Sequence, residues 1–158
     1  MDSDPRLVPS IVDRLIDPES GGTRDRRGYS VQQMVAAVRR DLENLLNTRR
    51  GVLSLPAEFP ELDSSPLAYG LPDFGSVGTA SRPQQEAIGR RIELAIARFE
   101  PRLTDVRVRM LEDGAKSGNL NLKFQIESRL ATDPFPDISF ETVLELTTGY
   151  AKIEAKTT

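Results

Sequence analysis

The sequence contains no histidine and no cysteine among its 158 residues, and it has no tryptophan. Without histidine and cysteine the chain cannot form a Ser-His-Asp or Cys-His catalytic arrangement, a zinc site built on those ligands, or a disulfide. Any chemistry would therefore rest on carboxylates, hydroxyls, lysines or arginines. The lack of disulfides agrees with a reducing compartment.

Long hydrophobic runs are also missing. The longest purely apolar run, Met34 to Val38, is far shorter than the ~20 residues that a membrane span requires. The first residues, MDSDPRLVPS, are acidic, whereas a secretory signal begins with basic residues and an apolar run. The sequence has no basic stripe with interleaved aromatics, so nothing in it indicates nucleic-acid binding. We therefore expect a cytoplasmic protein that neither inserts into a membrane nor binds nucleic acid.

The residues that are present indicate a globular protein. Hydrophobic residues make up 38% of the chain and charged residues 28%, which is typical of a folded domain with a sizeable core. We expect a short helix and a polar loop in residues 1–28, followed by a single α+β domain over residues 29–158.

Three segments show the spacing of amphipathic helices. A short helix is predicted from Ser10 to Ile16, with Ile11 and Leu15 on an apolar face that must dock on something. Longer helices are predicted for Ser30 to about Asn47 and Ser81 to about Phe99. Each begins with a serine that is followed three residues later by glutamine, which is a capping-box pattern.

From Asp105 onward the hydrophobic period changes to two, which predicts strands. The alternating stretches are VRVRM, NLNLKFQIESRL, ISFETVLELTT and YAKIEA. The expected fold class is α+β, in which two main helices and a short N-terminal helix pack on a mostly antiparallel sheet of three or four strands.

Residues 51–80 are rich in proline and glycine and carry only acidic charges, which argues against regular structure. The segment from Leu53 to Phe74 is nevertheless too apolar for a solvated linker. We expect an ordered, extended loop that packs over the domain or against a partner. The candidate contact residues in this loop are Tyr69, Leu71, Asp73 and Phe74.

The stretch ARFEPRL places Glu100 at the end of a predicted helix, directly before Pro101. A carboxylate at this position opposes the helix macrodipole, at a cost of up to ~1 kcal/mol. Arg102 is the expected compensating partner, with Arg98 or Arg49 as further candidates. This pattern predicts a brace between the helix end and the first strand.

The alternative hypothesis makes Glu100 the general acid of a hydrolase. A glycosidase needs a second carboxyl across the scissile bond, and the sequence does not designate one. The carboxylates that can be suggested for that position are Asp73, Asp105, Glu112 and Asp113. Because the aromatic platforms of carbohydrate sites are also scarce, the structural interpretation is favoured.

Four stretches together resemble the TssE proteins. In order, they are IVDRL, SVQQMVAAVRRDLENLLNTRRG, YGLPDF and IELAIARFEPRL, and the resemblance spans roughly Ile11 to Gly149. TssE proteins are baseplate wedge components of the type VI secretion system, related to wedge proteins of contractile phage tails once labelled lysozyme-like. One departure is Asn44, where the family usually has an aromatic residue, often tryptophan.

The resemblance implies assembly without catalysis or cofactors, in a cytoplasmic baseplate at the inner-membrane complex. The implied partners are the wedge subunits TssF, TssG and TssK and the sheath subunits TssB and TssC. The implied mechanism is strand addition to an open sheet edge, which starts sheath assembly. A phage-like tail protein, a peptidoglycan hydrolase and an adaptor of another assembly stay open as alternatives. We expect the contact residues to be Glu100, Pro101, Arg102, Arg49, Tyr69, Leu71, Asp73, Phe74, Ile11 and Leu15.

Overall fold

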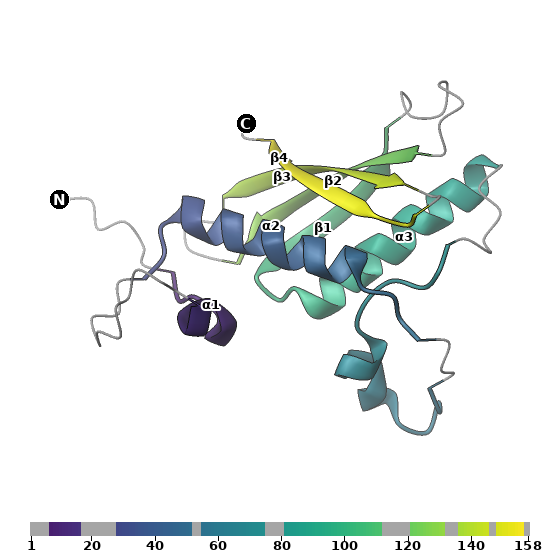
Figure 1. The fold of residues 1–158 in the computed structure, drawn as a ribbon, viewed down its shortest axis with the longest axis horizontal. Helices are drawn as coiled ribbons and strands as arrows, with labels where there is room; N and C mark the ends of the chain where they lie inside the picture. The colour runs from purple at the N-terminus through teal and green to yellow at the C-terminus, as the bar shows by residue number, and fades with distance from the viewer. Residues whose placement is uncertain are drawn as a thin grey trace.

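The computed structural model describes residues 7–16, 28–51, 55–74, 81–111, 121–131, 136–145 and 148–156. These residues form three α-helices, two short 3-10 helices and four strands (Figure 1). The α+β prediction is therefore confirmed for the described residues. The elements are α1 (Ile11–Ile16), α2 (Val31–Asn47), η1 (Pro60–Ser64), η2 (Pro66–Ala68), α3 (Arg82–Phe99), β1 (Leu103–Met110), β2 (Asn121–Leu130), β3 (Asp137–Glu145) and β4 (Ala151–Lys156).

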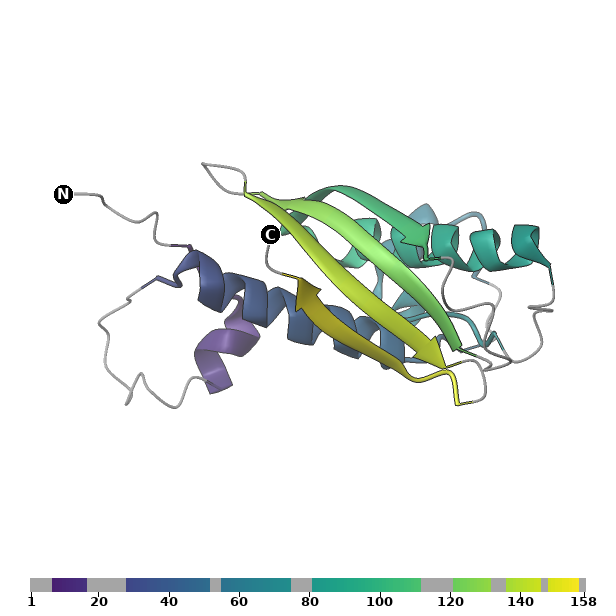
Figure 2. The same ribbon diagram turned by 90° about the horizontal axis from the view of Figure 1, so that it is seen from above.

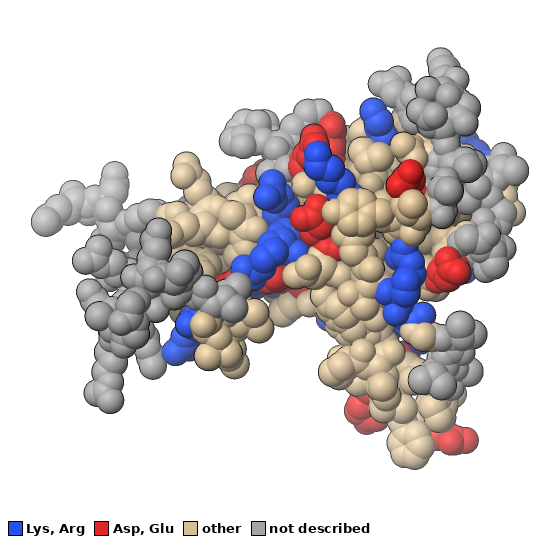
Figure 3. Space-filling view, in the orientation of Figure 1, with Lys and Arg blue, Asp and Glu red and all other residues tan. Residues whose placement is uncertain are grey.

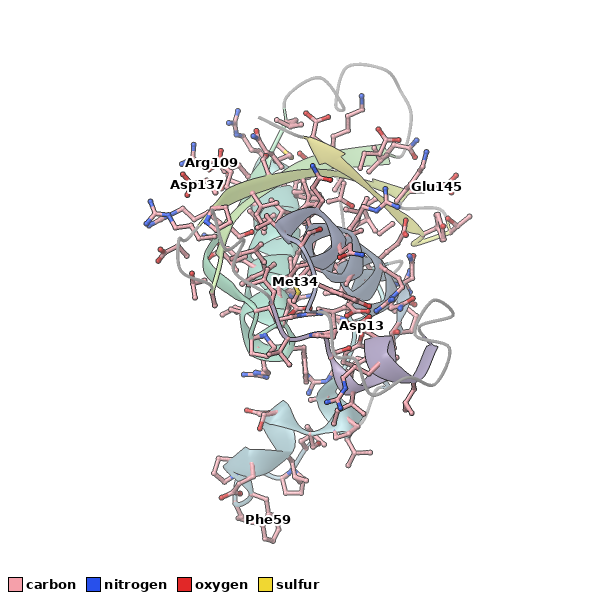
Figure 4. All side chains as sticks on the ribbon, turned by 90° about the vertical axis from the view of Figure 1, so that its left-hand side faces the viewer. Asp13, Met34, Phe59, Arg109, Asp137 and Glu145 are labelled. Carbon is pink, nitrogen blue, oxygen red and sulfur yellow. The ribbon has the colours of Figure 1, made fainter. Side chains whose placement is uncertain are left out.

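The four strands form one antiparallel meander in the order β1-β2-β3-β4, so β1 and β4 are its edges. Viewed from above, the sheet is twisted, with α2 beside β4 and α3 beside β1 (Figure 2). Both long helices lie on the same side of the sheet (Figure 4). The opposite face of the sheet is mainly polar because the strands alternate buried and accessible residues.

The core lies between the helices and the sheet. In β2 the alternation buries Leu122, Phe124 and Ile126 against the apolar stripes of α2 and α3. Helix α3 packs closely on the sheet at Gly89, where a Cβ atom would lie at contact distance, 3.4 Å, from the Phe124 ring. The buried side chains of the strands, which recur every two residues, and those of the helices, which recur about every 3.6 residues, therefore pack together in one layer.

Both capping boxes are present. Ser30 donates its N–H to Gln33 Oε1 at 2.9 Å, and its Oγ accepts from the Gln33 N–H at 3.2 Å. Ser81 donates its N–H to Gln84 Oε1 at 3.2 Å in the same way. A cap of this kind stabilises a helix start by ~1 kcal/mol. The sequence therefore predicted both starts correctly, to within one residue.

The loop between α2 and α3 is more structured than expected. The prediction that it lacks regular structure is wrong, because η1 and η2 lie within it. Residues 55–67 project from the domain, with Phe59 at the far end (Figure 4), and we call them the projecting segment. Residues 68–74 return to the core, where Leu71 exchanges backbone hydrogen bonds with Thr48 and Arg50 at 2.9 and 2.8 Å. Leu53 lies outside the described residues.

The apolar residues of α1 do not dock on the domain. The sequence predicted that its apolar face must dock on something, and here Ile11 is 74% exposed and Leu15 is 79% exposed. The side of α1 that faces the domain carries Asp13, which is buried. The ion pairs of Asp13 with Arg40 and Arg102, and not apolar packing, set the orientation of the helix. None of the described helices is long and apolar enough to cross a bilayer.

Candidate functional site

Glu100 and Arg102 form a buried ion pair at the connection from α3 to β1. The N–H and Nε of Arg102 donate to Glu100 Oε1 at 3.2 and 2.6 Å, and Nη2 donates to Oε2 at 2.5 Å. The Glu100 side chain is only 5% exposed. Pro101 stands between the two residues and ends the helix, because proline disfavours helical geometry at the residue before it.

Arg102 also reaches the other two helices. Its Nη2 lies 2.5 Å from Asp41 Oδ2 of α2, and its Nη1 lies 3.7 Å from Asp13 Oδ2 of α1. The hydrogen bond to Glu100, together with that to Asp41, raises the pKa of Arg102 well above its ordinary value. One permanently charged guanidinium therefore joins carboxylates from three separate parts of the fold.

Asp13 and Arg40 extend this contact. Asp13 accepts from Arg40 Nη2 at 2.5 Å and from the Oγ and N–H of Ser10 at 2.7 and 3.1 Å. Arg40 also donates to Asp41 Oδ1 through Nε at 3.0 Å and Nη2 at 2.8 Å. Burial alone raises the pKa of Asp13, but the hydrogen bonds from Ser10 and Arg40 outweigh it and hold this pKa below its ordinary value.

We call this cluster the ionic junction; its members are Asp13, Arg40, Asp41, Glu100 and Arg102. Three carboxylates against two guanidinium groups leave one net negative charge. Asp13 and Glu100 are nearly shielded from solvent, so each depends on its arginine partner to offset the cost of desolvation. Removing either arginine would leave a buried carboxylate without adequate compensation.

Tyr69, which follows the projecting segment, lies beside the junction. Tyr69 contacts Phe99 edge to face, with ring centroids 5.3 Å apart. Burial, and the negative charges of Asp41 and Glu100, raise the pKa of the Tyr69 phenol. The structure thus places Tyr69 near Glu100 and Asp41, a proximity that the sequence did not predict. The loop residues Leu71 and Phe74 are buried in the core and Asp73 is exposed.

Arg49 and Arg98 do not compensate Glu100, so this part of the prediction is wrong. Arg49 donates to the carbonyl oxygen of Gly149 and to that of Leu46. Arg98 Nη1 donates to the carbonyl oxygen of Asp63 at 3.1 Å and so attaches α3 to the projecting segment. Both arginines support loops, whereas Arg102 alone bonds Glu100 within the described residues.

Of the carboxylates suggested as catalytic partners of Glu100, Asp105 pairs with a different residue. Asp105 is exposed and lies 3.6 Å from Arg129 Nη1. Glu112 and Asp113 lie outside the described residues. The carboxylates that do approach Glu100, through Arg102, are Asp13 and Asp41, and both are bound by arginines. The geometry therefore favours a structural role for Glu100.

Sequence reasoning missed three members of the junction: Asp13, Arg40 and Asp41. Asp13 follows Ser10 by three residues, a spacing that indicates a helix start, and its side chain does bond Ser10. That spacing gives no sign of burial. Arg40 and Asp41 sit in a helix rich in charges, where a solvated pair is the ordinary interpretation.

Exposed apolar residues gather on two projections of the molecule. The first, which we call the α1 apolar face, comprises Val8, Ile11, Val12 and Leu15. The second is the projecting segment, in which Phe59 and Leu67 are each 57% exposed. Both lie on the same side of α2 (Figure 1). Figure 3 shows the projecting segment as a mainly uncharged lobe with acidic residues near its tip.

Comparison with known proteins assigns the chain to one family. A family model described as baseplate wedge protein gp25 matches residues 32–134, which is more than half of the chain. The search of curated proteins found no match for this chain. A solved chain in the structure entitled "The baseplate complex from the type VI secretion system" is similar, with 16% sequence identity and a TM-score of 0.48. The match covers 80% of this chain and 97% of the solved chain.

Proposed function

Because the chain belongs to the baseplate wedge protein gp25 family, we propose that it is a non-enzymatic structural subunit of a type VI secretion baseplate. In this proposal it links wedge subunits to the contractile sheath and helps to start sheath assembly. Its wedge partners are TssF, TssG and TssK, its sheath partners are TssB and TssC, and it acts in the cytoplasm at the inner-membrane complex. The four TssE-like stretches of the sequence support the choice of a secretion system over a phage tail.

The main observation in support of the proposal is the orientation that the ionic junction gives to α1. Asp13 holds the polar side of α1 against Arg40 and Arg102, so the apolar side chains point away from the domain. A six-residue helix has little stability of its own and owes its position to these contacts. Apolar residues gathered on one exposed face are typical of a protein–protein contact. We propose that the α1 apolar face, with Ile11 and Leu15 at its centre, docks on another wedge subunit.

The residues around Glu100 have a supporting role in this proposal. Glu100, Pro101 and Arg102 fix the exit from α3, and Tyr69 covers the same region. Arg49, Leu71, Asp73 and Phe74 lie where the loop of residues 51–80 joins the domain. We propose that this rigid junction holds α1 and the projecting segment in the relative positions that a wedge partner recognises.

A hydrolase has no comparable support in the geometry. A general acid must carry a proton and reach its substrate, whereas both oxygens of Glu100 accept hydrogen bonds from Arg102 in a buried position. A turbidity assay on purified peptidoglycan tests this alternative. Activity that disappears in Glu100→Gln would support the hydrolase and contradict the proposal.

The proposal is tested by capturing wedge subunits with the tagged chain from the native host. We expect the double variant Ile11→Asp/Leu15→Asp to lose these subunits while it keeps the melting temperature of the wild type. The matched control is Leu94→Asp, which also adds a charge at an exposed apolar residue, but on α3. Equal recovery of wedge subunits by the wild type and the double variant would contradict the docking role of α1.

A further inference from the structure

The two edges of the sheet differ in how many of their outward-facing backbone groups are already bonded. At β4, the hydrogen bond from the Glu145 N–H to the Tyr150 carbonyl sets the alternation of the β3–β4 pair. Lys152 and Glu154 therefore direct their backbone groups toward β3, whereas Ala151, Ile153 and Ala155 direct theirs to the outer edge. These three residues would receive a partner strand added to β4.

Side chains of α2 bond three of the six outward-facing backbone groups of these residues. Asn47 accepts from the Ala151 N–H through Oδ1 and donates to the Ala151 carbonyl through Nδ2, both at 2.8 Å. Glu43 Oε1 accepts from the Ile153 N–H at 3.3 Å. The Asn47 amide offers one acceptor and one donor, as a backbone residue of a neighbouring strand would.

The spacing of the two elements explains this match. Asn47 and Glu43 are four residues apart in α2, which is ~6 Å along a helix axis. Ala151 and Ile153 are two residues apart in β4, which is about 6.6 Å along a strand. The helix therefore presents one side chain to each successive outward-facing residue of β4, and α2 itself lies beside this edge (Figure 2).

The edge at β1 is more open. The hydrogen bond from the Leu111 N–H to the Lys123 carbonyl places the backbone groups of Val108 and Met110 on the outer side. Glu93 Oε2 of α3 accepts from the Val108 N–H at 2.9 Å. Within the described residues, the Val108 carbonyl and both backbone groups of Met110 have no hydrogen bond on that side. A strand added here has to displace a single side chain.

From this difference we infer that β1 is the edge that accepts a partner strand, and that α2 closes β4 against strand addition. The inference rests on the strand addition contained in the proposed function and specifies its site. Unpaired N–H and C=O groups on an edge strand are the template for an added strand. At β4 an incoming strand would have to replace three hydrogen bonds and move α2.

The side chains of β1 indicate the chemistry of the added strand. Arg107 and Arg109 are exposed on the solvent face of the sheet, whereas Val106, Val108 and Met110 are half-buried toward α3. A strand that alternates acidic and apolar residues would pair with the arginines on one face and cover the exposed parts of the apolar residues on the other. We therefore infer an extended segment of this alternating type as the partner of β1.

Two proline variants test the choice of edge. Met110→Pro and Ala155→Pro each remove one outward-facing N–H, and proline is tolerated at such edge positions. With purified sheath subunits as the probe, we expect Met110→Pro to weaken binding about tenfold, the effect of losing a ladder hydrogen bond and its neighbours. Ala155→Pro is the matched control and should bind as the wild type does. Thermal melting checks that both variants are folded.

Hydrogen exchange of the unmodified chain gives a second measurement that does not depend on the variants. On binding sheath subunits, the Met110 amide should become protected, while Ala151 and Ile153 are already protected in the free chain. Loss of binding in Ala155→Pro alone, or new protection confined to Ala155, would overturn the choice of β1 and leave strand addition intact. Sheath binding without any change at either edge would contradict strand addition itself, and the inference with it.

Discussion

Asp13 of α1 and Arg40 of α2 lie 27 residues apart in sequence and form an ion pair 2.5 Å long. The carboxylate is fully shielded from solvent, whereas the guanidinium remains partly exposed. This contact turns the polar side of α1 toward the domain and leaves Ile11 and Leu15 in solvent. The orientation of the N-terminal helix thus depends on one buried carboxylate.

Replacement of Asp13 by alanine should destabilise the protein. The variant loses the hydrogen bonds from Arg40 and Ser10 and leaves Arg102 with one fewer carboxylate nearby. We expect the free energy of unfolding to fall by about 2 kcal/mol, since Arg40 keeps Asp41 as a partner. Urea unfolding measures the change. Ile11→Ala, on the exposed side of the same helix, is the control and should stay within ~0.5 kcal/mol of the wild type.

The same carboxylate predicts a dependence of stability on pH. The folded protein holds the pKa of Asp13 below its ordinary value of 3.8, because the bonds from Ser10 and Arg40 outweigh the opposing effect of burial. A lowered pKa adds stability at neutral pH, which is lost as pH falls below 3.8 and through the folded pKa. The difference in unfolding free energy between wild type and Asp13→Asn should therefore shrink in acid. A difference that grows as pH falls would contradict this assignment.

Much of the fold was predictable because local rules and tertiary packing agree in it. The stripe of α2, from Met34 to Leu46, and the alternation of β2 both indicate burial, and both are buried. The capping boxes at Ser30 and Ser81 fixed the starts of the long helices. At these places each residue type suits its local backbone and its position in the core.

The junction was only half predictable. Glu100 and Arg102 are only two residues apart in sequence, so their pairing followed from the charge at a helix end. Asp13, Arg40 and Asp41 join them through contacts that span 61 residues and more, for which no local pattern exists. The short helices η1 and η2 were missed because prolines, which argued against regular structure, start both of them.

Arg102→Lys tests whether the fork geometry of the guanidinium is needed. A lysine keeps the charge but cannot bond Glu100 through two nitrogens while it also reaches Asp41. We expect a loss of about 2 kcal/mol of stability in urea unfolding. The exposed Arg107→Lys on β1 is the matched control. Equal stability of the two variants would show that a point charge is enough at position 102.

Asn47→Ala should open the outer edge of β4. The variant removes both hydrogen bonds to Ala151, so the Ala151 amide should exchange with solvent about tenfold faster or more. Asn44→Ala is the control, because Asn44 lies on the same helix but is exposed. Hydrogen exchange followed by mass spectrometry or NMR measures the rates. Unchanged exchange at Ala151 would show that Asn47 does not protect this edge.

Charge reversal at the junction should affect assembly. Arg102→Glu places a fourth carboxylate next to Asp41 and Glu100, which weakens the hold on α1 and on the exit of α3. We expect cells with this variant to assemble few sheaths, while circular dichroism of the purified chain shows that most of its secondary structure is kept. Sheaths at normal frequency would show that the junction has no role in assembly.

The central claim is tested most directly by counting fluorescent sheaths in host cells that lack this chain and in cells that regain it. We predict that cells without the chain form almost no sheaths, that the wild-type chain restores them, and that Ile11→Asp/Leu15→Asp does not restore them at equal protein level. Sheath formation at wild-type frequency in cells without the chain would contradict the account.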